Sequence, residues 1–131
     1  MFSAWDIINS NRRLNPRHKV RLMASVSLVL KESEESEAAS VLAYTRDLSR
    51  DGLAIVLPSA RMGCHDLSAG EYQLSIILAI SAESSVRLTA RLIHCEIFED
   101  ESGAGYLVGV RIEDLNAEDR TLYDEFIGGL H

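Results

Sequence analysis

Arginine is the residue type in this sequence whose spacing most suggests binding chemistry. The guanidinium group holds a phosphate through two parallel hydrogen bonds, and its flat face stacks on a nucleotide base. Any one pair with the spacing Arg-x-x-x-Arg reads equally well as two solvated side chains, and the spacing occurs four times, at 13–17, 17–21, 46–50 and 87–91. We interpret Arg87 and Arg91 as solvated, because both fall on the polar face of a predicted strand, Val86–Phe98.

The copy at 17–21, spelled RHKVR, has a different context. It belongs to a basic run that contains no acid and comprises Arg12, Arg13, Arg17, Lys19 and Arg21. Pro16 precedes it, and proline breaks a helix and keeps the residue before it extended. We therefore expect residues 12–21 to form a flexible cationic arm that leads into the first strand.

A second polar element, DLSRDG, occupies 47–52 between two predicted strands. Asp and Ser side chains close tight turns by bonding to nearby backbone, and Gly supplies a positive φ. This element alone therefore predicts a hairpin turn. A near copy, DLSAG at 66–70, is one residue shorter, and we interpret it as a plain turn.

Composition limits the partners of such an arm. The chain has 131 residues, of which 47% are hydrophobic, and a formal net charge of -7. Phosphate neutralisation supplies most non-specific affinity for nucleic acid. A chain as acidic as this one is therefore a poor general binder of DNA or RNA. The apolar runs are too short to span a membrane, and Met1–Ser10 does not resemble a secretory signal. We expect a cytoplasmic protein whose cationic arm binds a small anion.

Other chemistry is weakly represented. Cys64-His65 and His94-Cys95 supply zinc-type ligands, but neighbours on a strand point to opposite faces, so we expect no metal site. Two cysteines give no disulfide framework. The sequence has no glycine-rich phosphate loop with lysine and no nucleophile elbow, so we expect no enzymatic activity.

The elements that must position the arm and the turn are mostly strands. Phe2, Trp5 and Ile8 fall at roughly helical spacing, which predicts a short helix or turn over 1–11. Alternating hydrophobicity and turn residues predict six strands after it, at 22–31, 40–46, 52–57, 72–81, 86–98 and 106–112.

A helix is expected to follow the last strand. Asn116 is its predicted N-cap, the helix runs to about Ile127, and Gly128-Gly129 stops it. Its apolar stripe comprises Leu122, Tyr123, Phe126 and Ile127. These patterns predict an all-β fold, a six-stranded antiparallel barrel, closed or split, with a C-terminal helix, as one domain over 12–130.

The two polar elements and the chain end together resemble the PilZ family. The family pattern is Arg-x-x-x-Arg, then after one hairpin Asp/Asn-x-Ser-x-x-Gly, on a six-stranded barrel closed by a helix. Here the first part reads RHKVR at 17–21 and the second reads DLSRDG at 47–52. The segment YLVGVRIEDLNAEDRTLYDEFI at 106–127 is similar to the family's last strand and closing helix. The resemblance covers about residues 12–130.

The resemblance implies a receptor for the bacterial second messenger cyclic di-GMP, with no other cofactor. The roles that it implies for binding this ligand fall on Arg17, Arg21, Asp47, Ser49 and Gly52. Arg12 and Arg13 are expected as additional phosphate contacts. Such a receptor relays its signal to a protein effector that the sequence does not identify.

Three alternatives stay open at this point. The first is a PilZ-like module for protein–protein interaction that binds no nucleotide, with a partner or homodimer surface that includes Trp5 and Ile8. The second is a small-barrel binder of nucleic acid, which the acidic body and only eight aromatic residues disfavour. The third is an enzyme of unrecognised type.

Overall fold

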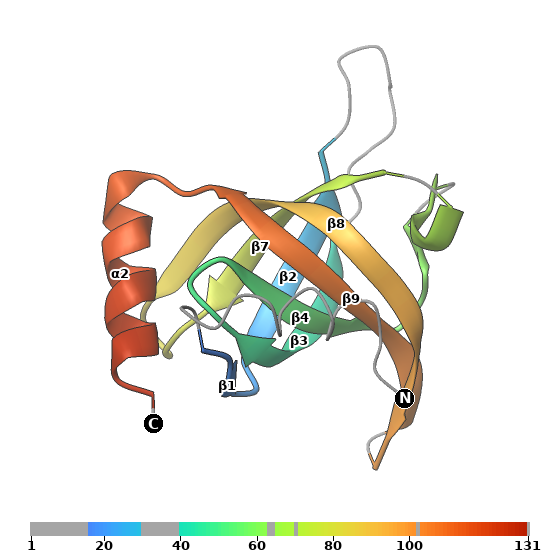
Figure 1. Ribbon diagram of the computed structural model, residues 1–131, viewed down its shortest axis with the longest axis horizontal. Coiled ribbons are helices and arrows are strands. Elements are labelled where there is room, and N and C mark those ends of the chain that lie inside the picture. Colours follow the sequence, from blue (N-terminus) through green and yellow to red (C-terminus); the bar gives the residue numbers. More distant parts are fainter. Residues whose placement is uncertain (1–15, 30–39, 63–64, 70, 102, 131) are drawn as a thin grey trace.

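The computed structural model describes residues 16–29, 40–62, 65–69, 71–101 and 103–130 (Figure 1). The predicted helix or turn over 1–11 therefore lies outside the described residues. The strands are β1 His18–Lys19, β2 Met23–Leu28, β3 Val41–Leu48, β4 Gly52–Leu57, β5 Arg61–Met62, β6 His65–Asp66, β7 Gln73–Ala79, β8 Ser85–Asp100 and β9 Gly103–Asp114. The helices are a 3-10 turn at Leu67–Ala69 and α2 at Ala117–Gly128.

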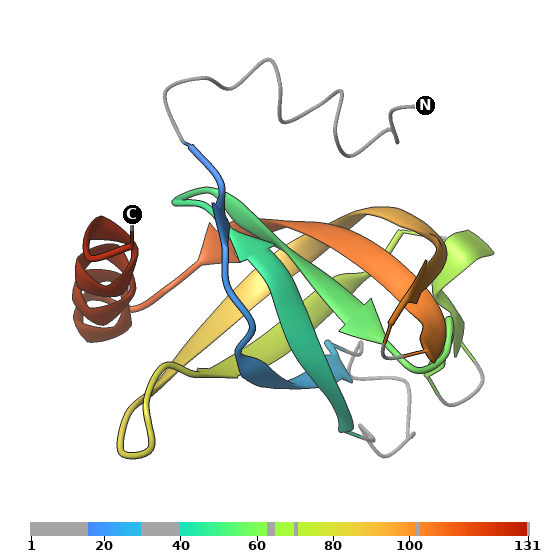
Figure 2. The ribbon, with the colours of Figure 1, turned by 90° about the horizontal axis from the view of Figure 1, so that it is seen from below.

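The long strands form a closed antiparallel barrel. Neighbours follow the order β3-β2-β7-β8-β9-β4, and β4 pairs back to β3, so the ring of six strands closes. The short β1 pairs with β3 beyond the end of β2, on the same edge of β3 (Figure 2). The predicted six-stranded barrel with a C-terminal helix is confirmed.

Alternating side chains build the barrel core. Ala24, Val26 and Leu28 of β2 are buried, and so are alternate residues of β7. This agrees with the predicted period of two, in which every second side chain faces inward. Each fully buried Leu, Ile or Val stabilises the fold by about 1.5–3 kcal/mol relative to an exposed one.

Strand β4 is buried along its whole length, GLAIVL. Leu53, Ile55 and Leu57 belong to the barrel core, whereas Ala54 and Val56 belong to a second cluster with Leu107 of β9. Partly buried Tyr44, Ile93 and Phe98 pack against this second cluster. We call these six residues the outer cluster, because strand alternation places them on the outside of the barrel wall.

Helix α2 closes one end of the barrel, as both ribbon views show (Figures 1 and 2). Asn116 Oδ1 accepts a hydrogen bond from the Asp119 amide at 2.8 Å, which confirms the predicted N-cap. Tyr123 and Ile127, one turn apart, are buried in the core. Leu122 is 39% exposed, so its assignment to the buried stripe is wrong, since it is rotated about 100° from Tyr123 on the helix.

Several boundaries differ from those predicted. Strand β3 runs on to Leu48, so Asp47 lies within a strand rather than in the turn. The segment that contains the predicted plain turn at 66–70 includes the end of β6 and the 3-10 turn. The β8–β9 pairing extends to Gly103, beyond the predicted ends of both strands. None of the helices among the described residues is both long and apolar enough to cross a membrane.

Candidate functional site

A β-bulge in β3 sets the geometry of the candidate site. Ala43 and Leu48 both belong to the barrel core although they are five residues apart, and strict alternation would put them on opposite faces. The β3–β4 register shifts between Thr45 and Asp47, because a bulge gives β3 one extra residue there relative to β4. Leu48 therefore returns to the core, and its neighbour Asp47 lies on the outer side of the barrel wall.

Asp47 binds the first arginine of the arm. Arg17 Nε donates to Asp47 Oδ1 at 3.0 Å, and Arg17 Nη2 donates to the same oxygen. The two side chains are 22% and 8% exposed, so this ion pair is partly screened from water. Among the described residues no donor reaches Asp47 Oδ2, which leaves one carboxylate oxygen as an acceptor in a sheltered position.

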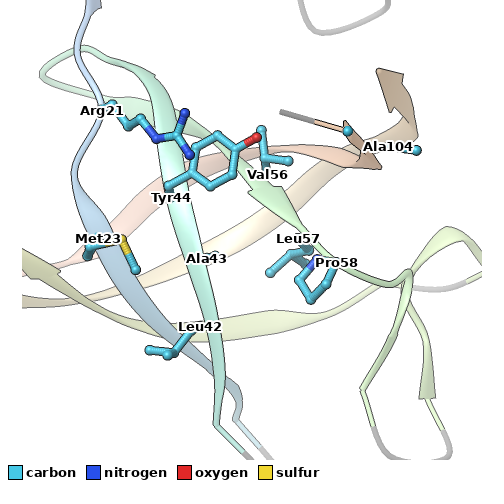
Figure 3. Close-up of a pocket in the computed structure, with 10 residues that line it drawn as sticks. Arg21, Met23, Leu42, Ala43, Tyr44, Val56, Leu57, Pro58 and Ala104 are labelled. Carbon is cyan, nitrogen blue, oxygen red and sulfur yellow. The ribbon is translucent and has the colours of Figure 1, made fainter. Parts of the chain in front are cut away.

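The guanidinium group of the arm's second arginine lies over an aromatic ring. The Arg21 guanidinium carbon is 3.9 Å from the centroid of the Tyr44 ring (Figure 3). Arg21 itself is exposed, and Tyr44 is part of the outer cluster. A cation stacked in this way is attracted by the ring quadrupole.

A pocket of about 320 Å³ opens beside this stacked pair. Its wall is mostly apolar, and Arg21 is the cation that lines it. In Figure 3 the Tyr44 ring lies beside Val56, and Met23, Leu42 and Pro58 line the pocket farther from the Arg21 end. The pocket therefore combines a flat cationic group with an apolar floor, which suits a planar aromatic ring.

Thr45 fixes the arm to β3 at a second bulge. Lys19 pairs with Asp47 but Met23 pairs with Tyr44, so one extra residue lies between β1 and β2. Buried Thr45 bridges this irregularity: its hydroxyl donates to the Val20 carbonyl at 2.6 Å and accepts from the Leu22 amide at 2.8 Å. The expected flexible arm is therefore paired with β3 from His18 onward, through β1 and then through backbone bonds of Val20 and Leu22.

The 49–52 turn is closed by its own serine. The Ser49 amide donates to the Gly52 carbonyl at 2.8 Å, and the Ser49 hydroxyl lies 3.2 Å from both the amide nitrogen and the carbonyl oxygen of Gly52. Ser49 is only 3% exposed. Gly52 does not have the positive φ predicted for it, since Gly103 alone does among the described residues. Gly52 is instead the buried first residue of β4.

Helix α2 and strand β9 also donate hydrogen bonds to the backbone of this turn. The Tyr123 hydroxyl donates to the Ser49 carbonyl at 2.6 Å, and Arg120 Nη1 donates to the Arg50 carbonyl at 3.1 Å. The Ile112 amide of β9 donates to the Asp51 carbonyl at 2.7 Å. Burial raises the pKa of the Tyr123 phenol well above its usual range, so this donor stays protonated at neutral pH.

The described part of the near copy, at 66–69, is closed by a local bond of its own aspartate, as expected for a plain turn. Asp66 Oδ1 accepts from the amide and the hydroxyl of Ser68, at 3.0 and 2.6 Å. These bonds lower the pKa of the Asp66 carboxyl, with a smaller contribution from Arg61. Tyr123 and Arg120 of α2 both donate to the 49–52 turn, whereas no hydrogen bond from α2 to this turn is found among the described residues.

The structure thus brings together most of the residues expected from the sequence. Arg17 binds Asp47, and Arg21 lies over Tyr44, which is on the same strand as Asp47. Ser49 and Gly52 close the turn that follows this strand. Arg12 and Arg13 lie outside the described residues. Arg87 and Arg91 are exposed on β8, and Arg91 pairs with Glu113 at 3.0 Å.

Sequence reasoning missed three residues of the site: Tyr44, Thr45 and Tyr123. No motif marks them, because their roles depend on which strand or helix lies opposite. Cys64, one of the zinc-type ligands for which we expect no metal site, lies outside the described residues. Among those described, no three His, Cys, Asp or Glu side chains gather as a metal would require.

The chain forms a closed six-stranded antiparallel barrel with a helix at one end. The arginine arm pairs with β3 of this barrel, and together these features define a class of small β-barrel domains. The family model described as PilZ domain matches residues 11–129. The chain belongs to the PilZ family. No curated protein matches the chain.

Solved structures show the same fold. The chain is similar to the PilZ domain with c-di-GMP of YcgR from Escherichia coli, with a TM-score of 0.63 and 13% identity, covering 91% of each chain. It is similar to the inhibitor of motility MotI/DgrA of Bacillus subtilis (TM-score 0.57, 18% identity, 88% of this chain and 48% of that one). It is also similar to MrkH of K. pneumonia in its c-di-GMP complex (TM-score 0.59, 12% identity, 86% and 49%). The chain thus spans about half the length of MotI and MrkH.

Proposed function

We propose that this chain is a receptor for cyclic di-GMP that binds its ligand on the outer face of β3. The observation that carries the proposal is the Arg17–Asp47 ion pair, which joins the arginine arm to the strand before the serine turn. The two elements are 30 residues apart in the sequence, and the fold places them side by side. Family membership and the two neighbours solved with c-di-GMP support the same ligand.

The chemistry of the two arginines suits a cyclic dinucleotide. Arg21 presents a flat, exposed cation on Tyr44, on which a guanine base can stack. Arg17 presents N–H donors to a phosphate or to the O6/N7 edge of guanine. Asp47 Oδ2 can accept from a guanine N–H group, and this acceptor disfavours an approach by phosphate alone.

The spacing of the two arginines also suits the ligand. They are four residues apart, which is at most roughly 13 Å at about 3.3 Å per residue, and the bulge between β1 and β2 shortens this span. One arginine can therefore bind a base while the other binds the phosphate ring. Ser49 and Gly52 are proposed to complete the site from the turn, and Arg12 and Arg13 to add phosphate contacts.

We propose that the bound receptor acts through a partner protein rather than as an enzyme. Met23 and Leu42 are 54% and 70% exposed and lie beside the Arg21–Tyr44 pair. A ligand bound at Arg21 would change the surface around these two side chains. This observation also favours the second candidate function, a PilZ-like interaction module that works without nucleotide, either with an effector or as a homodimer.

Calorimetric titration with cyclic di-GMP separates these candidates. We expect saturable binding to the native chain, weakened roughly ten- to a hundredfold in Arg21→Ala, because a hydrogen bond to a charged group contributes about 1.5–3 kcal/mol. Arg87→Ala is the matched control: it removes the same charge from exposed β8 and is expected to bind like the native chain.

A native chain that shows no binding would contradict the receptor proposal and favour the interaction module. Equal affinity of Arg21→Ala and the native chain would place the ligand elsewhere on the molecule.

A further inference from the structure

We infer that Tyr123 is a positioning residue for the ligand-binding turn, acting from α2 through its hydroxyl group. The inference rests on the proposed function and extends it to a residue outside both motifs. Among the described residues, the hydrogen bond of the Tyr123 hydroxyl goes to the turn and not to the arm. Its expected effect passes through the backbone of Ser49, which follows Asp47 and Leu48 at the end of β3.

Each backbone carbonyl group of the 49–52 turn accepts a hydrogen bond. The Ser49 carbonyl accepts from Tyr123, the Arg50 carbonyl from Arg120, and the Asp51 carbonyl from the Ile112 amide. The Gly52 carbonyl accepts from Ser49 within the turn. All four carbonyls of 49–52 are therefore occupied, three of them by groups from α2 or β9.

Tyr123 makes the shorter and more buried of the two side-chain contacts from α2 to these carbonyls. Its hydroxyl-to-carbonyl distance is 2.6 Å and its ring is fully buried in the barrel core. Arg120 and Asp124, on either side of it, reach Arg50 from more exposed positions, and the Arg50–Asp124 pair is 3.6 Å long. The ring anchors the donor, and the donor fixes the Ser49 carbonyl.

Packing alone does not call for a tyrosine at this position. A phenylalanine would fill the same core volume, so the hydroxyl serves the contact with Ser49. A buried carbonyl without a donor is unfavourable, and the turn would relax to regain a partner. Such a relaxation would move Ser49 and, through Leu48, the backbone that carries Asp47.

The test compares Tyr123→Phe with Ile127→Val. Ile127 is buried one helical turn later in the same core, so its truncation weakens α2 packing without touching the turn. We expect Tyr123→Phe to bind cyclic di-GMP about three- to tenfold more weakly by calorimetry, the cost of one neutral hydrogen bond. We expect Ile127→Val to stay within about twofold of the native chain, although both lower the melting temperature.

Amide hydrogen exchange gives a readout that does not need the ligand. In Tyr123→Phe the amides of Ser49 and Gly52 should exchange faster relative to core amides of β7, whereas Ile127→Val should leave that ratio unchanged. Native-like affinity in Tyr123→Phe would overturn the positioning role. If the native chain binds no cyclic di-GMP, the proposed function fails separately, and an unchanged exchange ratio in Tyr123→Phe then overturns the inference.

Discussion

Asp47 shows at the scale of one residue how the fold tolerates a sheltered charge. Its side chain is 8% exposed, and Arg17 donates to it twice. An unpaired buried charge is strongly unfavourable, whereas a paired and hydrogen-bonded one is tolerated. Asp47 therefore holds the arm in place as well as offering an acceptor to the ligand.

We predict that Asp47→Ala lowers the free energy of unfolding by about 1.5–3 kcal/mol, because Arg17 loses a charge-assisted partner in a partly buried position. Urea unfolding measures the change. The control is Glu113→Ala, which breaks the more exposed Arg91–Glu113 pair and should lower stability by less than about 1 kcal/mol. Equal losses in the two variants would contradict a special structural role for Asp47.

At the scale of elements, the site depends on two irregularities in strand pairing. One bulge in β3 brings Asp47 to the outer face, and another between β1 and β2 brings Arg21 over Tyr44. Alternating hydrophobicity predicted most strands, but a bulge breaks the alternation by one residue and leaves no local signal in the sequence. Thr45 reads as an ordinary strand residue until its hydroxyl is seen between two backbone groups.

We predict that Thr45→Val loosens the arm, because valine keeps the shape but leaves the Val20 carbonyl and the Leu22 amide without their partner. The cost of such unsatisfied buried groups is about 1–3 kcal/mol, measurable by urea unfolding, and the Leu22 amide should exchange faster. Thr89→Val on β8 is the control, since no side-chain hydrogen bond is described for Thr89. A Leu22 amide that exchanges at the native rate would contradict the role of Thr45.

At the scale of the whole molecule, the sequence predicted the barrel, the helix and its Asn116 cap, because these depend on local pattern. It also singled out the Arg17–Arg21 pair, which the fold brings to Asp47 and Tyr44 of β3. Tyr44 could not be predicted, because its contact with Arg21 depends on how the arm pairs with β3. Tyr123 could not be predicted, because α2, distant in the chain, brings it to the turn. The reason given for Gly52 was wrong, since the Ser49 hydroxyl closes the turn without a positive φ.

Charge is distributed over the molecule in a way that fits a small ligand. The chain carries a net charge of -7, yet arginines line one outer face of β3. An acidic body repels long polyanions, while a local cationic face still attracts a small dianion. The outer face of β3 is therefore the surface on which we expect the ligand to bind.

Amide chemical-shift mapping during a titration with cyclic di-GMP tests that claim most directly. We predict saturable shifts that concentrate at Arg17, Arg21, Tyr44 and Ser49, because these residues surround the proposed ligand position. Amides of β8, the strand opposite β3 in the barrel ring, should change little. A titration without shifts, or with shifts centred on β7 and β8, would contradict the account.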